Sequence, residues 1–438
     1  MTKLNIAGGR RSRAAATWVT LALSLGAAGV AGLSIADSSR ADSPTASAGD
    51  QANSLIERGR YLARAGNCVS CHTAHDGGEA FAGGLAFETP FGKIYSTNIT
   101  PDPETGIGKW TEEQFARALR EGVRPDGAHL YPAFPYTAYT KLSDEDVSAL
   151  WAYMKIVKPV NNQTPENEMS FPANQRWALG IWKTMFFDEG RFQENKSQSP
   201  EWNRGAYLVE ALGHCSACHS PRNFMGAEKS SLAYTGGEYN DKVMTGEIRE
   251  WSAPNLTNAK NGLGPWPVEE VAAYLKTGRN AFSETHGPMN EVILNSTRHL
   301  TDEDTMAMAT YLKSLPPNEG KVGKPASAEV MKSGEALYNL HCGTCHQPDG
   351  LGALSEDAGA KLVGNPVVQA SNPASLINVM LYGPHLAKLP GPKRWKDMPN
   401  DFGAKLTDEE VALIASYMRN SWGNVGGVVT EAQVAKQR

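Results

Sequence analysis

Cysteine and histidine recur in one fixed spacing, Cys-x-x-Cys-His, at three places in this chain, and the three copies contain all six of its cysteines. Two thiols at this spacing can each add to a vinyl group of haem, and the histidine that follows can ligate the iron from one face. The motif therefore predicts three covalently bound haem c groups. The predicted attachment residues are Cys68, Cys71, Cys215, Cys218, Cys342 and Cys345, and the predicted proximal iron ligands are His72, His219 and His346.

Other uses of paired cysteines fit this spacing less well. A structural zinc site needs four ligands, usually from two pairs that lie close together, but the first cysteines of the three copies are 147 and 127 residues apart. A redox pair needs no histidine after the second cysteine, yet all three copies have one. A disulfide between residues only three apart in every copy would be unusual. Haem attachment is the interpretation that uses every residue of the motif.

A haem held by one histidine has a second face, which a methionine commonly fills in small c-type cytochromes. Met398 stands eight residues before Leu406, and Met289 stands eleven residues before Leu300, each in a stretch predicted to be a loop before a helix. We expect these two methionines to be the distal ligands at the third and second sites.

The first copy departs from this pattern. The residue eight positions before Leu142 is Phe134, whose side chain cannot ligate iron. His129 is the nearest candidate ligand in the same loop, and Met154 is another at the end of the following helix. A five-coordinate iron, or a ligand brought in by a rearranged loop, are the remaining alternatives. We take His129 as the candidate and leave the others open.

The segments around the three motifs share one order of elements. Each has a helix with an early glycine before the motif, a middle helix, and a last helix that opens with Ser or Thr followed by acidic residues, an N-cap and capping-box pattern. The glycines occur in Arg58-Gly59, Arg204-Gly205 and Ser333-Gly334, and the last helices open at Ser143, Thr301 and Thr407. Repetition at this scale indicates tandem domains. We predict an all-α fold of three tandem class I-like cytochrome c domains, over residues 52–160, 201–317 and 331–422.

The ends of the chain differ from these repeats. Basic residues near the N-terminus precede an uncharged apolar stretch, residues 14–33, and small residues before position 37 suit cleavage after Ala36. Residues 1–36 are therefore predicted to be a signal peptide, with an uncleaved membrane anchor as the alternative. Export agrees with haem c, which is attached outside the cytoplasm. Residues 423–438 are expected to be a polar tail, and the net charge of −5 gives no indication of a nucleic-acid partner.

A linker over residues 161–200 contains an unusually aromatic stretch that is predicted to form an amphipathic helix. Its apolar residues can either pack between the first two domains or contact a membrane surface or a quinone, and both can hold. The candidate contact residues are Trp177, Ile181, Trp182, Met185 and Phe186.

The three motifs, the Leu-[Ser/Thr]-Asp-Glu-[Asp/Glu] openings of the last helices, and Leu130–Tyr136 (Leu-Tyr-Pro-Ala-Phe-Pro-Tyr) resemble the triple-haem cytochrome c subunit of bacterial membrane-bound sugar, polyol, gluconate and alcohol dehydrogenases. The resemblance covers nearly the whole chain after residue 36. Many alcohol dehydrogenase-type members have methionine where this chain has Phe134, so the distal ligand of the first haem is the point of departure.

The resemblance implies an electron-transfer subunit that is not an enzyme on its own. It would accept electrons from a catalytic dehydrogenase subunit with FAD or pyrroloquinoline quinone (PQQ), with a small third subunit as a further expected partner, and would pass them to ubiquinone. It would lie on the periplasmic face of the bacterial cytoplasmic membrane, at the inner-membrane surface. The alternatives are a cytochrome subunit of a molybdenum hydroxylase, or a haem enzyme similar to thiosulfate dehydrogenase or a peroxidase that uses the first haem.

Overall fold

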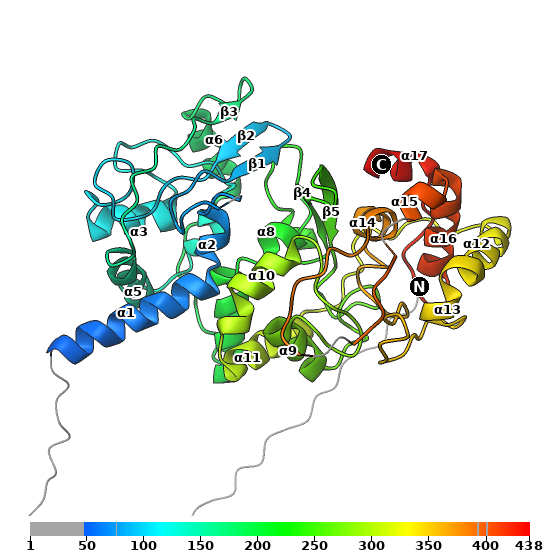
Figure 1. Ribbon diagram of the computed structural model, residues 1–438. Coiled ribbons are helices and arrows are strands. Elements are labelled where there is room, and N and C mark those ends of the chain that lie inside the picture. The colour runs from blue at the N-terminus through cyan, green and yellow to red at the C-terminus, as the bar shows by residue number, and fades with distance from the viewer. Residues whose placement is uncertain (1–47, 76, 392–393, 400–401) are drawn as a thin grey trace, which may run out of the picture. The chain divides into compact units, whose positions relative to one another are not determined.

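Three crossed helix pairs repeat along the chain in the computed structural model, which describes residues 48–75, 77–391, 394–399 and 402–438 (Figure 1). The pairs are α1 (Ala48–Ala65) with α5 (Asp144–Met154), α7 (Pro200–Tyr207) with α11 (Asp302–Ser314), and α12 (Ala328–His341) with α16 (Asp408–Asn420). We call the parts of the chain that contain them the first, second and third units. The predicted signal peptide, residues 1–36, lies outside the described residues.

A glycine lies at the crossing point of each helix pair. An added Cβ would come 1.9 Å from a carbonyl oxygen of the partner helix in the first two units and 2.4 Å in the third, closer than non-bonded atoms can approach. The crossing pairs are Gly59 with Ala149, Gly205 with Ala307, and Gly334 with Leu413. The repeated glycine is therefore what allows each first helix to lie directly on the last helix of its unit.

Shorter helices complete the units. A middle helix follows each motif, and single-turn helices carry the motifs or lie before the last helices. They are α2 (Cys68–Cys71), α3 (Glu112–Glu121), α4 (Tyr136–Tyr139), α6 (Ala178–Phe186), η1 (Leu208–Leu212), α8 (Ser216–His219), η2 (Ser230–Leu232), α9 (Val268–Thr277), α10 (Met289–Asn295), η3 (Thr297–His299), α13 (Gly343–His346), α14 (Ala374–Tyr382), α15 (Phe402–Lys405) and α17 (Glu431–Gln437).

The all-α prediction needs a correction, because two small antiparallel sheets accompany the helices. One has the order β1 (Ala86–Thr89), β2 (Gly92–Tyr95), β3 (Glu168–Met169), and the other pairs β4 (Gly237–Lys242) with β5 (Ile248–Ala253). Ala86 pairs with Tyr95, and Gly237 pairs with Ala253. The fold is mainly helical, and each hairpin is inserted between an attachment motif and the middle helix of its unit.

The last helix of each unit begins at the predicted N-cap. The hydroxyls of Ser143, Thr301 and Thr407 accept from the backbone N–H three residues on. The predicted capping box forms in the third unit, where Glu410 accepts from the backbone N–H of Thr407. In the first two units the prediction of a capping box is wrong, because the acidic residue at that position binds an arginine instead: Arg58 donates to Asp146 and Arg204 donates to Asp304, each at 2.8 Å.

Two tyrosines join the first and second units reciprocally. The hydroxyl of Tyr61 donates to Asp304 at 2.5 Å, and the hydroxyl of Tyr207 donates to Asp146 at 2.5 Å. Each tyrosine stands two residues after the crossing glycine of its own unit, whereas the third unit has Ala336 there. This symmetric exchange satisfies both buried carboxylates and fixes the two units as a pair.

Asp304→Asn should lower the free energy of unfolding by about 1–3 kcal/mol at neutral pH, because it removes a charged partner of Arg204 and Tyr61. Burial opposes ionisation of Asp304, but hydrogen bonds from Arg204 and Tyr61 hold its pKa below the usual range. A depressed carboxyl pKa contributes stability above the unfolded value, about 4, that is lost as pH falls through the folded value. Denaturant titrations at neutral pH and at about pH 3 should therefore show the two proteins converging in acid.

Asp302→Asn is the matched control for this prediction, because Asp302 begins the same helix but its side chain is 85% exposed. It should change stability by less than about 0.5 kcal/mol. An Asp304→Asn protein as stable as the wild type at neutral pH would contradict the proposed role of the exchange.

The first and second units share one hydrophobic core, and the third has its own. Leu62, Leu150, Leu212 and Leu312 all belong to the shared cluster, so the first two units are less separate than three tandem domains imply. The second sheet connects the third unit to this pair (Figure 1), because Ser252 in β5 and Ser375 in α14 exchange three buried hydrogen bonds of 2.8–3.1 Å.

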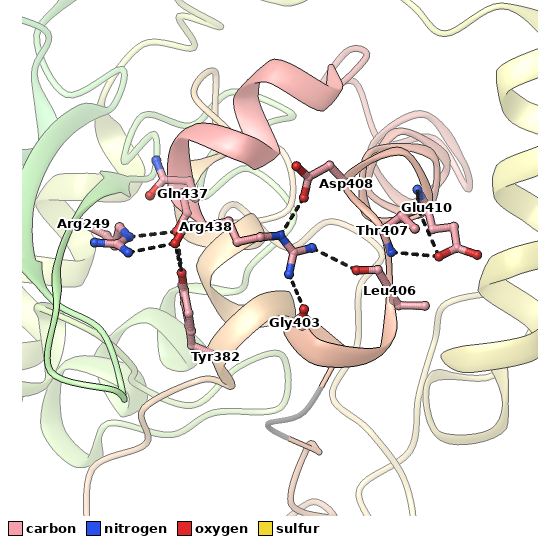
Figure 2. A network of polar contacts seen from close by, with 9 residues as sticks. All are labelled: Arg249, Tyr382, Gly403, Leu406, Thr407, Asp408, Glu410, Gln437 and Arg438. Carbon is pink, nitrogen blue, oxygen red and sulfur yellow. Dashed lines mark hydrogen bonds and ion pairs between the residues drawn. The ribbon is translucent and has the colours of Figure 1, made fainter.

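The C-terminal tail is bound to both the second and third units (Figure 2). Arg249 from β5 donates to the carbonyl of Gln437 at 2.9 Å, and Tyr382 from α14 donates to the same oxygen at 2.7 Å. Arg438 donates to Asp408 at 2.7 Å and to the carbonyl of Leu406 at 2.9 Å. The tail expected to be polar thus forms helix α17 and holds the start of α16.

Candidate haem-binding sites

Each attachment motif lies shortly after the first helix of its unit, and in the second unit η1 follows α7 before the motif. The helix pair fixes the direction in which the motif is presented, and the single helical turns α2, α8 and α13 each contain four of its five residues. The helical turn places the two cysteines and the following histidine close together. The crossing glycine therefore acts on the site indirectly, because it determines where the motif lies relative to the last helix.

The three motif histidines have the same orientation. In each, Nδ1 lies 2.7 Å from a backbone carbonyl oxygen, which can only accept, so Nδ1 carries the proton. The pairs are His72 with Thr97, His219 with Pro254, and His346 with Ala360. This tautomer leaves the lone pair on Nε2, as an iron ligand requires. Burial also lowers the pKa of all three rings, which favours the neutral form.

A repeated Asn-x-Thr turn sets the carbonyl that orients the histidine in the first two units. Asn98 accepts from both the backbone and the hydroxyl of Thr100, and its amide donates to Val160 at 2.7 Å. Asn255 makes the same contacts with Thr257 and donates to Asn318. The two turns, Asn98–Thr100 and Asn255–Thr257, therefore act as supports for the proximal histidines.

No disulfide joins any two of the six cysteines, all of which lie within the described residues, and their environment does not suit a redox pair. Burial raises the pKa values of the thiols, to about 11 for Cys68 and about 12 for Cys71, Cys215 and Cys342. Reactive redox cysteines have lowered values. Within the described residues no three His, Cys, Asp or Glu side chains gather as metal ligands, so nothing there supports a zinc site.

The second unit offers further atoms that fit a haem. The indole N–H groups of Trp251 and Trp266 are buried and have no hydrogen-bond partner within the described part of the chain. Buried donors without partners are rare in proteins, and a haem propionate is an acceptor that could satisfy them. Two thiols, an oriented imidazole and these donors fit a covalently attached haem c.

Met398 lies outside helices and strands, as predicted, whereas Met289 is the first residue of a helix and not part of a loop. Met289 begins α10 and is partly buried against the shared core. Met398 lies in the described segment 394–399 before α15 and is also partly buried. Ligation by these two methionines remains a prediction.

His129 lies against helix α6. This position argues against its predicted role as the distal ligand of the first haem iron. Its Nδ1 is 3.1 Å from Nζ of Lys183, and its Nε2 is 3.3 Å from the position that a Cβ on Gly180 would take. Lys183 also donates to the carbonyl of Gly122 at 2.9 Å. Burial lowers the pKa of this lysine to about 8. Nδ1 of His129 thus contacts Lys183 and Nε2 lies close to Gly180, so both ring nitrogens face the linker helix.

Met154 occupies a core position. It is 2% exposed and stands twelve residues after Leu142, as Leu312 stands twelve after Leu300 and Met418 twelve after Leu406. Leu312 and Met418 are buried in the cores of their units. A methionine in this register packs on the inner face of the last helix, which explains Met154 without iron.

The aromatic linker helix α6 has one buried and one exposed side. Trp182, a candidate contact residue, is instead 8% exposed, and its indole N–H donates to the carbonyl of Met225 in the second unit at 2.9 Å. Phe186 is partly buried beside it. Trp177, Ile181 and Met185 are 68%, 55% and 50% exposed. The helix packs between units and also leaves an apolar stripe uncovered.

Two phenylalanines outside α6 are also highly exposed. Phe171 is 80% exposed and Phe224 is 90% exposed. Chain neighbours of both residues contact Phe91. The backbone N–H of Ser170 donates to the carbonyl of Phe91 at 2.9 Å, and the ring of Phe91 lies 3.2 Å from where a Cβ added to Gly226 would be. We call Phe171, Trp177, Ile181, Met185 and Phe224 the apolar surface patch. Exposed apolar groups gathered in this way usually mark an interaction surface.

The reciprocal hydrogen bonds of Tyr61 and Tyr207 correspond to a short sequence pattern, which the spacing of the attachment motifs does not reveal. Arg-Gly-x-Tyr occurs at Arg58 to Tyr61 and at Arg204 to Tyr207, but not around Gly334. The difference marks which two units form the pair. No comparable signal points to Phe171 and Phe224, which are isolated aromatic residues in loops.

Comparison with known families agrees with this geometry. The family "Cytochrome c" matches residues 56–158 and 203–316, and the family "Cytochrome C oxidase, cbb3-type, subunit III" matches residues 329–418. The matched ranges contain all three attachment motifs. These are cytochrome c domains, and they indicate covalently bound haem c.

Characterised relatives extend the comparison to nearly the whole chain. The chain is 42% identical to one of the subunits of nicotinate dehydrogenase from Pseudomonas putida, over 85% of its own length but only 31% of that protein's. It is 41% identical to the fructose dehydrogenase cytochrome subunit of Gluconobacter japonicus over 87% of itself and 82% of the relative. It is also 41% identical to the cytochrome c subunit of alcohol dehydrogenase (quinone) of Gluconacetobacter polyoxogenes, over 89% and 85% of the two chains. The chain therefore belongs to the family of cytochrome c subunits of dehydrogenase complexes, which carry electrons for a separate catalytic subunit.

Proposed function

We propose that this chain is a triple-haem electron-transfer subunit that passes electrons from the flavin or PQQ catalytic subunit of a membrane-bound dehydrogenase to ubiquinone. The observation that carries the proposal is the identical orientation of His72, His219 and His346, each with Nδ1 on a backbone carbonyl at 2.7 Å. A bound haem supplies a one-electron ferric/ferrous couple.

The residues of the chain hold and tune these groups. The cysteine thiols would hold each haem covalently, the oriented imidazole would be one iron ligand, and Met289 and Met398 would be the second ligand at the second and third sites. A thioether ligand favours the reduced iron and raises the potential. The shared core and the tyrosine exchange keep the first two sites at a constant separation.

The partner is expected to be a sugar, polyol, gluconate or alcohol dehydrogenase subunit, together with a small third subunit. A second candidate is the cytochrome subunit of a molybdenum hydroxylase, since one relative is a subunit of a dehydrogenase that acts on nicotinate, which is neither a sugar nor an alcohol. Purification of the tagged chain from its own host would decide between them. We expect a flavin- or PQQ-containing protein to co-purify, and its substrate to reduce the haems. Co-purification of a molybdenum protein would support the second candidate, and a chain that purifies without a dehydrogenase would contradict both.

The apolar surface patch is proposed to contact the periplasmic surface of the inner membrane and to admit ubiquinone there. Among the described residues no helix has both the length and the hydropathy needed to cross a bilayer. Exposed aromatic and aliphatic groups could instead enter the interfacial region, where apolar burial favours binding. Cleavage after Ala36 remains part of the proposal, so the patch rather than residues 14–33 would hold the mature chain to the membrane.

The triple variant Trp177→Ser, Ile181→Ser, Met185→Ser should reduce binding to bilayer vesicles at least about tenfold, because each apolar side chain contributes about 1.5–3 kcal/mol when buried. The three side chains are at least half exposed, so folding should be little affected. Flotation with anionic vesicles and ubiquinone reduction by the complex are the two measurements.

The control for this variant is Leu340→Ser with Leu354→Ser in the third unit, where the side chains are 71% and 62% exposed. It should leave both measurements unchanged. Equal loss in the control, or none in the triple variant, would show that the patch has no special role at the membrane.

A further inference from the structure

The backbone places Phe134 in the position that Met289 has in the second unit. Leu130 N donates to the carbonyl of Gly122 at 2.8 Å, and Thr285 N donates to that of Gly278 at 2.7 Å. Both glycines follow the middle helix and have positive φ, 61° and 76°. The two loops therefore leave the middle helix in the same way, and four residues beyond these hydrogen bonds stand Phe134 and Met289.

The third unit gives the same alignment independently. Phe134 is followed by a proline and stands eight residues before Leu142, and Met398 is followed by a proline and stands eight residues before Leu406. A phenyl ring has no lone pair to donate to iron. The position proposed to supply the distal ligand in the other two units thus supplies none in the first.

The surroundings of Phe134 are aromatic. Its ring lies 5.5 Å from that of Tyr139, and the hydroxyl of Tyr139 donates to the carbonyl of Gly66, two residues before Cys68. This hydrogen bond holds the Phe134–Tyr139 pair close to the attachment motif. The hydroxyl of Tyr139 donates to the backbone and therefore does not donate its proton to a haem ligand. His129 lies against α6 and Met154 lies in the core, as described above, so neither ring nitrogen nor thioether replaces the missing methionine.

We infer that the iron attached at the first motif has an open sixth position, beside Phe134, that takes a small neutral diatomic ligand such as carbon monoxide or nitric oxide. An aromatic wall disfavours a charged ligand, because burying a charge without a partner is costly, and distal polarity decides which ligands a haem binds. The inference rests on the proposed function, in that it needs a haem on Cys68 and Cys71.

The test uses the purified full chain. Mass spectrometry of the haem-bearing peptides is done first, because absence of haem from the Cys68 peptide would contradict the proposed function and this inference together. With all three peptides loaded, the dithionite-reduced protein is titrated with carbon monoxide. We expect about one-third of the haem to show the Soret shift of a carbonyl complex.

Two variants identify the responsible position. Phe134→Met should reduce carbon monoxide binding at least about tenfold and add a methionine–iron charge-transfer band to the oxidised spectrum. Phe115→Met, at a core phenylalanine of the same unit, should do neither. A fully loaded wild-type protein that binds no carbon monoxide, or a Phe134→Met protein that binds it as the wild type does, would overturn the inference.

Discussion

Gly205→Ala is expected to destabilise the protein by about 3–5 kcal/mol, among the largest effects of a single methyl group. The added Cβ would lie 1.9 Å from the carbonyl oxygen of Ala307 and 3.0 Å from the Cβ of Tyr311. Neither atom can rotate away, because both belong to the facing turns of α11, so α7 and α11 must separate. Separation would open the shared core and expose the second attachment motif, which follows α7 and η1. Denaturant unfolding followed by circular dichroism is the measurement.

Gly190→Ala is the matched control, because a Cβ there meets nothing within 4 Å and its φ is not positive. This variant should differ from the wild type by less than about 0.5 kcal/mol. A Gly205→Ala protein that unfolds at the wild-type midpoint would contradict the account of the helix crossing.

Met289→Ala is expected to lower the reduction potential of one haem by an amount on the order of 0.2 V while the other two are unchanged, since axial ligands set haem potentials over a wide range. The variant loses the thioether that favours ferrous iron but keeps His219 and both thiols, so the number of attached haems should stay the same. A spectroelectrochemical titration resolves the three transitions.

Met308→Ala provides the comparison for this variant. Met308 is 2% exposed within α11 and belongs to the shared core, so its truncation should lower stability by about 2–5 kcal/mol and leave the potentials unaltered. Identical potentials in Met289→Ala and wild type would remove Met289 from the distal position.

Local chemistry could be predicted from the sequence. The attachment motifs, the N-caps at Ser143, Thr301 and Thr407, and the order of helices depend on residues within a few positions of one another, and the structure has the predicted N-caps and helices. Repetition strengthened these predictions, because three copies of each pattern constrain one another. The crossing glycines were visible for the same reason.

Contacts between distant segments could not be predicted in this way. Trp182 is buried because Met225, more than forty residues away, accepts its N–H, and periodicity alone gives no information about that partner. Asp146 and Asp304 have a capping-box position in sequence, but Arg58 and Arg204 compete successfully for their carboxylates. The β4–β5 hairpin was missed because its strands are polar and are stabilised by α14 of the next unit.

The most direct test of the proposed function is anaerobic reduction of the intact complex by the substrate of its catalytic subunit, followed by addition of a ubiquinone analogue. We predict that substrate raises the α-band absorbance of all the haem c in the chain. At the sites with a distal ligand, the absorbance should reach the level obtained with dithionite, and it should fall again when the quinone is added. Haems that stay oxidised while the catalytic subunit turns over with an artificial acceptor, or reduced haems that the quinone does not reoxidise, would contradict the proposal that this chain carries electrons from the dehydrogenase to ubiquinone.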